Sequence, residues 1–186
     1  MQSKQEIKIL IHGYHENYPG ETSHLHLIKT FVDEFEETQL YSRNNFVGHL
    51  TASAFIYHPP SHQVLFIRHT ALNRWLQPGG HIELTDKDVL SAAIREAEEE
   101  TGIEASLLEA NHQLFDVDSH TIPANNKKNE PAHVHHDLRF LLLYHSTIEN
   151  LAIQSEVSGF EWLPVNQLKQ EAGFERVMAK LDLLAR

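Results

Sequence analysis

One segment, Gly79 to Ile103, restricts what this chain can fold into more than any other. It reads GGHIELTDKDVLSAAIREAEEETGI: a glycine pair, a short polar stretch, and a run rich in Ala, Leu, Ile and Glu that stops at Gly102. This composition and the glycine stop predict a helix over residues 90–101. Each helical residue advances about 100° around the axis, so three carboxylates share one edge of the helix. They belong to Glu96, Glu99 and Glu100.

The acidic edge borders an apolar face of the same helix. That face consists of Leu90, Ala93, Ile94 and Ala97. Three like charges at the margin of a core repel one another, and hard divalent cations such as Mg²⁺ prefer carboxylate oxygens. The edge is therefore suited to hold one or more such ions. Gly79 and Gly80 lack a Cβ and would let a backbone carbonyl approach the same ion, while Arg95 could brace one carboxylate through a bidentate contact.

The segment resembles the Nudix box, which is written Gly, five residues, Glu, seven residues, Arg-Glu-apolar-x-Glu-Glu-x-Gly-apolar. Residues 95–103 match its second half without a gap. In the first half, five residues after Gly80 lead to Asp86 in place of Glu, and eight residues rather than seven separate Asp86 from Arg95. This departure concerns the loop-to-helix brace that the glutamate supplies in relatives. It does not concern the metal ligands, which lie in the intact half.

The resemblance implies an α/β protein, specifically a Nudix α/β/α sandwich with a mixed β-sheet. It also implies divalent-metal-dependent hydrolysis of a phosphoanhydride bond, with Mg²⁺ or Mn²⁺ as the cofactor. The substrate would be a nucleoside diphosphate linked to another group, or a related small phosphorylated metabolite. The chain is thus expected to be a pyrophosphohydrolase.

The box residues take their expected roles from the same resemblance. The metal ligands would be Glu96, Glu99, Glu100 and a carbonyl of Gly79 or Gly80. The catalytic set would be Glu99, Glu100 and Arg95, in which Arg95 orients a ligand without touching the substrate. The general base stays open between a box glutamate and two later acidic residues, Asp137 and Glu156.

Composition narrows the classes of partner. The 186 residues include no cysteine, which excludes disulfides, thiolate metal sites and cysteine nucleophiles. The formal net charge of −11 would repel a nucleic acid duplex over most of the surface. No apolar run is long enough to cross a bilayer, and the first residues do not resemble a signal peptide. We expect a cytoplasmic protein that acts on a small phosphorylated molecule, with no membrane partner.

The first 45 residues lie outside the resemblance. Amphipathic patterns predict two helices, over residues 3–16 and 21–38, separated by Asn-Tyr-Pro-Gly. We expect residues 1–45 to form a helical hairpin that packs on a Nudix domain of residues 46–186. Packing is the favoured role, and a contribution to a pocket or to a homodimer contact is the alternative.

Histidines and aspartates mark a second polar region. Strands are predicted over residues 46–58, 63–69 and 114–120, and a further strand begins at residue 133. Alternation puts the side chains of several polar residues on one face, and pairing of the last two strands would bring them together. These residues are Asp116, Asp118, His120, His133, His135 and Asp137, and His81 could join them. A metal site, a phosphate or sugar contact, and a satisfied polar network are all compatible with this pattern.

The end of the chain fits the same family. Residues 156–164 resemble the closing Nudix strand, in which an acidic residue precedes Trp-Leu-Pro, and an amphipathic helix is predicted over residues 165–184. Two alternatives stay open at this point: a ligand-binding or sensor module without turnover, and an enzyme whose principal metal site is the His-rich face. The isopentenyl diphosphate isomerases of this fold use a cysteine, which this chain lacks.

Overall fold

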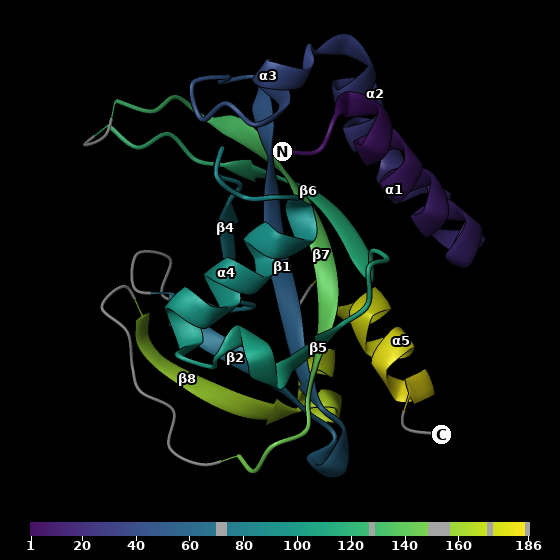
Figure 1. Cartoon of the computed structure of the whole chain (residues 1–186), viewed down its shortest axis with the longest axis vertical. Coiled ribbons are helices and arrows are strands. Elements are labelled where there is room, and N and C mark those ends of the chain that lie inside the picture. The colour runs from purple at the N-terminus through teal and green to yellow at the C-terminus, as the bar shows by residue number, and fades with distance from the viewer. Residues whose placement is uncertain (70–73, 127–128, 149–156, 171–172, 185–186) are drawn as a thin grey trace.

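The computed structural model describes residues 1–69, 74–126, 129–148, 157–170 and 173–184. Its centre is a mixed β-sheet with helices packed against it (Figure 1). The helices are α1 (Lys4–Asn17), α2 (His26–Glu34), α3 (Glu37–Leu40), α4 (Val89–Thr101) and α5 (Glu175–Leu184). The strands are β1 (Gly48–His58), β2 (Gln63–His69), β3 (Arg74–Leu76), β4 (Gly79–His81), β5 (Leu108–Ala110), β6 (Asp116–Ile122), β7 (His133–Tyr144) and β8 (Val157–Pro164).

Two long parallel strands, β1 and β7, form the middle of the sheet and change partners along their length. At the start of β1, the neighbours are β4 on one side and β7 on the other, and β6 lies beyond β7. Toward the end of β1, its neighbour is β2, which pairs with β3 and β8, while β5 replaces β6 beside β7. All the pairings except β1 with β7 are antiparallel. The sheet therefore has a β4-β1-β7-β6 end, where both polar regions lie.

Alternation along β1 divides the core into two parts. Leu50, Ala52 and Ile56 belong to the larger cluster, which also contains the apolar face of α4 and the N-terminal helices. Phe55 and Tyr57 belong to the second cluster, which includes residues of α5. On the α5 side, the apolar cluster covers only the later half of β1, and the earlier half carries polar side chains.

Helix α4 begins and ends at the residues that favour such boundaries. Asp88 is its N-cap and accepts a hydrogen bond from the backbone N–H of Ser91 at 2.7 Å, while the Ser91 hydroxyl accepts one from the N–H of Asp88. Gly102 ends the helix at φ 74°, a left-handed conformation that glycine adopts without steric cost. The helix predicted over residues 90–101 is confirmed, with one more residue at its start.

The predicted second helix, over residues 21–38, is wrong in its bounds. Pro19–Leu25 forms a 3₁₀ helix, α2 covers only His26–Glu34, and the extended backbone of Phe35 separates it from the short α3. Glu36 caps α3 in a capping box with Gln39, so a local cap replaces the continuous amphipathic helix that the apolar spacing indicated. The helix predicted over residues 165–184 is also divided, into a 3₁₀ turn (Val165–Gln170) and α5.

Lys180 of α5 contacts the N-terminal helical region. Its ammonium group is 6% exposed and donates hydrogen bonds to the Tyr14 hydroxyl of α1 at 2.8 Å, to the Glu21 carboxylate at 3.0 Å and to the Phe115 carbonyl at 2.7 Å. The Tyr14 hydroxyl in turn donates to Glu21. This buried cluster joins the N-terminal helices to the C-terminal helix beside the edge of the sheet (Figure 1).

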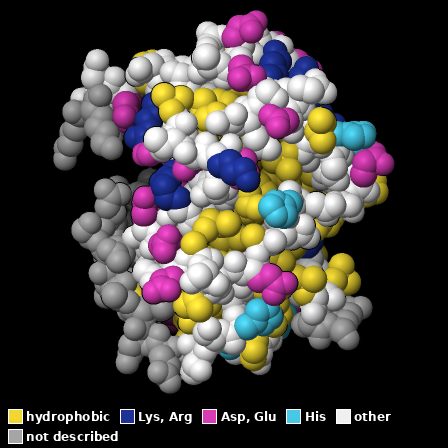
Figure 2. All heavy atoms as spheres, in the orientation of Figure 1, with side chains coloured by type: hydrophobic (Ala, Val, Ile, Leu, Met, Phe, Trp, Pro, Cys, Tyr) yellow, Lys and Arg dark blue, Asp and Glu magenta, His cyan; other side chains and the backbone are white. Residues whose placement is uncertain are grey.

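The outer surface agrees with the acidic composition. On the face in Figure 2, acidic side chains are dispersed, and the basic ones do not form a continuous band. Among the described residues, no helix has the length and apolar character needed to cross a membrane.

Candidate functional site

The three glutamates of α4 differ in exposure. The Glu96 side chain is 15% exposed, whereas that of Glu99 is 58% exposed. Glu100 is half-buried and accepts a hydrogen bond from the backbone N–H of Gly79 at 2.8 Å. The acidic edge therefore runs from solvent at Glu99 to a desolvated carboxylate at Glu96, beside the glycine strand β4.

Asp86 supplies the brace between loop and helix. Its carboxylate accepts two hydrogen bonds from the Arg95 guanidinium, from Nε at 2.9 Å and from Nη2 at 3.0 Å. It also accepts one from the N–H of Glu83 at 2.7 Å, which closes the loop into a turn. Asp86 has a shorter side chain than the glutamate of the box pattern, and the loop has one extra residue, but the bidentate contact with Arg95 still forms. The contact between loop and helix is therefore kept.

Arg95 connects the brace to the acidic edge. Its Nη1 donates to Glu96 and to Glu99, both at 3.0 Å, and its Nη2 donates to the carbonyl oxygen of His81 at 2.9 Å. The hydrogen bond with Asp86 is the largest influence that raises the pKa of Arg95 above its ordinary value. With every side chain ionised, one guanidinium faces the carboxylates of Asp86, Glu96 and Glu99, so negative charge is left over.

Burial has the opposite effect on Glu96. It raises the pKa of this carboxyl group above its ordinary value, and the nearby Arg95 only partly offsets that effect. A desolvated carboxylate with excess negative charge around it is stabilised by a cation. The donors at this edge are carboxylate oxygens, with a backbone carbonyl close by, and this is the ligand set that Mg²⁺ and Mn²⁺ prefer. The residues present thus fit a hard divalent ion.

The two glycines of β4 face opposite sides of the sheet. A Cβ at Gly80 would lie 2.7 Å from the carboxylate of Glu96, on the α4 side. A Cβ at Gly79 would lie 2.2 Å from the Cβ of Ser53 and 2.8 Å from the carbonyl oxygen of Ala52. Both glycines are therefore required by close approach, one to a functional side chain and the other to the backbone of β1.

Asp137, one of the two later acidic residues, does not join the box. Asp137 is buried on β7, and its carboxylate accepts hydrogen bonds from the hydroxyls of Thr51 and Ser53 at 3.0 and 2.8 Å and from Nε of Arg139 at 2.8 Å. Glu156 lies outside the described residues.

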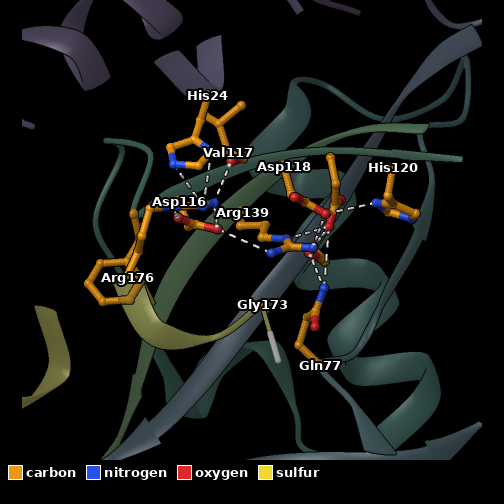
Figure 3. A network of polar contacts seen from close by, with 12 residues as sticks. His24, Gln77, Asp116, Val117, Asp118, His120, Arg139, Gly173 and Arg176 are labelled. Carbon is orange, nitrogen blue, oxygen red and sulfur yellow. Dashed lines mark hydrogen bonds and ion pairs between the residues drawn. The ribbon is translucent and has the colours of Figure 1, made fainter. Parts of the chain in front are cut away.

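Arg139 is the centre of an ion-pair network on the same side of the sheet as the histidines (Figure 3). Its guanidinium is 7% exposed and contacts Asp116 at 3.1 Å, Asp118 at 2.9 Å and Asp137 at 2.8 Å. Burial alone would lower its pKa, but these three carboxylates outweigh burial and raise it above the ordinary value. Arg176 adds a second cation beside Asp116, at 3.3 Å.

The predicted antiparallel pairing of the two His-rich strands is confirmed. His120 of β6 lies opposite His135 of β7, and Asp118 lies opposite Asp137. Asp116, Asp118 and Asp137, however, surround Arg139, so the carboxylates and the imidazoles form adjacent groups. Asp118 joins the two groups, because it also contacts Nδ1 of His120 at 2.9 Å.

His49 is the residue that the sequence reasoning missed. It lies on β1 opposite His135, and its ring packs on those of His81, His133 and His135 at centroid distances of 4.6–5.0 Å. Its position in the strand predicted over residues 46–58 was the available signal, since a histidine there alternates onto the same face as Thr51 and Ser53.

A hollow of about 650 Å³ lies elsewhere on the described part of the chain. It is lined by Tyr57, Glu109, Leu141, Leu143 and other residues at the β5 side of the sheet, and includes no box residue and no member of the histidine group. This hollow therefore contains none of the predicted site residues.

Comparison with known proteins gives a consistent family. Residues 48–182 match the NUDIX domain. A probable DHNTP pyrophosphohydrolase of Lactococcus lactis subsp. cremoris (strain MG1363) is 41% identical over 93 residues, which make up 50% of this chain and 52% of that protein. The chain thus spans about half the length of this curated relative.

Solved structures share the fold. The E. coli dihydroneopterin triphosphate pyrophosphohydrolase aligns with a TM-score of 0.55 at 16% identity, over 73% of this chain and 94% of that one. A C. elegans Ap4A hydrolase gives 0.54 at 17%, over 73% and 94%, and a NUDIX family hydrolase from Clostridium perfringens gives 0.51 at 27%, over 73% and 97%. The domain match covers most of the chain and includes the whole box, and the chain belongs to the Nudix family.

Proposed function

We propose that this protein is a metal-dependent pyrophosphohydrolase that cleaves a phosphoanhydride bond in a small phosphorylated metabolite. The acidic edge of α4 carries the proposal: three glutamates beside the glycine strand, with one arginine that is bound to a loop carboxylate. Glu96, Glu99 and Glu100 would hold Mg²⁺ or Mn²⁺, together with a carbonyl of Gly79 or Gly80. When bound, such an ion acidifies a water molecule and withdraws charge from the phosphoryl oxygens.

The protein groups around the ion have separate tasks. Glu96 and Glu100 are oriented by Arg95 and by the N–H of Gly79, so their oxygens are fixed before substrate arrives. Arg95 is a positioning residue, because its five N–H donors are directed at protein groups of the loop, the helix and β4. Glu99 reaches solvent and can accept a proton from water there. We therefore favour a box glutamate as general base over Asp137, whose carboxylate already accepts several hydrogen bonds.

The substrate class follows from the relatives and not from a specific contact. We propose a nucleoside diphosphate linked to another group, or a comparable triphosphate such as those in the names of the relatives. The decisive screen offers dihydroneopterin triphosphate, Ap4A and nucleoside diphosphate derivatives with Mg²⁺ or Mn²⁺, and measures phosphate release after a coupling phosphatase.

The test of the site replaces Glu99 and Glu100 by Gln together. Each change removes negative charge and keeps the side-chain volume, so the fold should remain while hydrolysis falls by at least roughly 100-fold. Glu98→Gln is the matched control, because Glu98 lies on the same helix and contacts the N–H of Ala105 instead of the glycine strand. Undiminished Mg²⁺-dependent hydrolysis in the double variant would refute the assignment.

A module that binds a ligand without turnover is the second candidate. Its prediction is distinct: the unmodified chain would bind a nucleotide derivative in calorimetry and release no product with either metal. The presence of Glu96, Glu99 and Glu100 favours the enzyme. We further propose that the protein acts in the cytoplasm and does not bind a nucleic acid duplex, in line with the acidic charge and the absence of cysteine.

A further inference from the structure

Five imidazoles meet at the β4-β1-β7-β6 end of the sheet, on the side opposite α4. Direct pairing places His49, His135 and His120 in one row across three strands. His133 precedes His135 by two residues on the same face of β7, and His81 of β4 pairs with Thr51, two residues after His49. The group therefore draws its members from four strands, which is a tertiary arrangement and not a local repeat.

The distances suit coordination. One nitrogen from each of His49, His81 and His135 can be chosen so that all three lie within 4.8 Å of one another. Tetrahedral Zn²⁺ with Zn–N bonds of 2.0–2.1 Å needs ligand nitrogens about 3.3 Å apart, which small rotations of these rings would reach. The Nε2 atoms of His133 and His135 are already 3.2 Å apart.

His49 supplies an independent observation. Its side chain is 1% exposed, and neither ring nitrogen has a hydrogen-bond partner among the described residues. A buried polar group left without a partner destabilises the fold, so such a group usually has a partner that has not been assigned.

The surrounding contacts resemble those that orient metal-binding histidines. Nδ1 of His133 lies 2.9 Å from the carbonyl oxygen of Pro131, and Nδ1 of His120 lies 2.9 Å from the Asp118 carboxylate. In metal sites, such a partner on one ring nitrogen fixes the tautomer and directs the other nitrogen toward the ion. The Nε2 atom of His133 is therefore free of the Pro131 contact and faces His135.

We propose that His49, His81 and His135 bind one transition-metal ion of the Zn²⁺ class, with His133 as the fourth ligand. Imidazole sets favour Zn²⁺, Ni²⁺, Cu²⁺ or Fe²⁺, whereas the carboxylate edge favours Mg²⁺ or Mn²⁺, so the two sites select different ions. His120 lies at the rim, where it links the group to Asp118. The site does not depend on the proposed hydrolysis.

The location gives the ion a defined consequence. His81 carries an imidazole on the histidine side of β4, while its carbonyl oxygen accepts from Arg95 on the other side. An ion held by His81, His49 and His135 would fix β4 against β1 and β7. Because the box glutamates lie beside β4, the ion would also hold the position of this strand next to them. The ion would have a positioning role and would take no part in the reaction.

The test measures metal directly. The full chain without a histidine tag is purified without chelators, and its metal content is determined by mass spectrometry. After removal of the metal, the chain is titrated with Zn²⁺ and with Co²⁺, whose visible absorption reports tetrahedral nitrogen ligands. We expect one tightly bound transition-metal ion per chain. Excess Mg²⁺ should not displace Co²⁺, so the Co²⁺ spectrum should stay unchanged.

Variants separate the two sites. His81→Ala and His135→Ala should each weaken Zn²⁺ binding by more than the roughly 10–100-fold that loss of an orienting partner causes. The exposed His145, which contacts Glu109 at 3.2 Å, provides the control His145→Ala, and the Glu99→Gln/Glu100→Gln chain should also keep its Zn²⁺. Because His81 is only half-buried, His81→Ala should fold, as circular dichroism would verify. The proposal would be overturned if the folded double variant His81→Ala/His135→Ala bound Zn²⁺ as tightly as the unmodified chain. It would also be overturned if the Glu99→Gln/Glu100→Gln chain lost its Zn²⁺.

Discussion

The acidic edge and the histidine side lie on opposite sides of the same short strand, β4, and the chain assembles them differently. The edge comes from one continuous segment, residues 79–100, and its exposure extends to 58% at Glu99. The histidine side and its neighbour Arg139 come from β1, β4, β6 and β7, and most of their polar atoms are buried. The comparison teaches that charged side chains near solvent remain accessible to a substrate, whereas charged side chains buried in the sheet must be paired with opposite charges from the protein.

The largest expected effect compares the two arginines. Arg139→Met leaves the carboxylates of Asp116 and Asp137 buried without their main cation, and should lower the free energy of unfolding by about 3–5 kcal/mol. Arg95→Met should cost clearly less stability, because Arg95 is 23% exposed and Glu99 reaches solvent, but it should reduce hydrolysis strongly. Urea unfolding followed by fluorescence measures the free energy of unfolding of both variants. Equal losses of stability would show that the two networks do not differ in the way described.

The second prediction uses the two glycines as a matched pair. Gly79→Ala places a methyl group against the backbone of β1, which cannot yield easily, and should destabilise the fold by about 1–3 kcal/mol. Gly80→Ala places it against the Glu96 carboxylate, the end of a flexible side chain. It should therefore leave the melting temperature nearly unchanged and lower the rate of hydrolysis. A reversal, with Gly80→Ala unstable and Gly79→Ala inactive but stable, would contradict the assignment of the two sides.

These contrasts also explain what the sequence could reveal. The acidic edge was predictable because helical spacing alone places Glu96, Glu99 and Glu100 together, and Gly102 marks the end of the helix. The pairing of β6 with β7 followed from alternation and from the turn-forming loop between them. His49 was not found, because its partners come from strands whose order cannot be derived from local spacing.

The sequence pattern also could not show that the polar residues of the sheet form two groups, carboxylates around Arg139 and imidazoles beside them. Alternation places Asp118, Asp137 and the histidines on one face, but it does not say which of them face an arginine. Arg139 lies in an apolar run, RFLLLY, and only the register with Asp116 shows that it is the partner of these carboxylates. The helix boundaries near Phe35 were missed for a similar reason, since a short-range cap at Glu36 outweighed a favourable amphipathic pattern.

The third prediction concerns the acid sensitivity that His136 of β7 gives to the fold. Burial, followed by His49, lowers the pKa of His136 to about 4, while the unfolded chain has the ordinary value of about 6.5. Between these values the unfolded state binds more protons. Stability from this group is therefore complete above about pH 6.5 and falls toward pH 4, by up to about 1.4 kcal/mol per pH unit.

Unfolding in urea at several pH values, with a chelator present, measures this slope. His136→Gln should flatten it, and the exposed His145→Gln should not. If both variants keep the slope of the unmodified chain, acid sensitivity does not arise at His136.

The cluster at Lys180 has a consequence for the order in which the protein can be completed. Tyr14 and Lys180 are 166 positions apart, so Tyr14 acquires its buried partner only after the ribosome has added 166 further residues. Until then, the hydroxyl of Tyr14 and the carboxylate of Glu21 lack the ammonium group that they surround in the finished fold. The packing of the N-terminal helices is thus completed only after α5 has been made, and a chain that began at residue 46 would leave the Lys180 ammonium group without two of its hydrogen-bond acceptors.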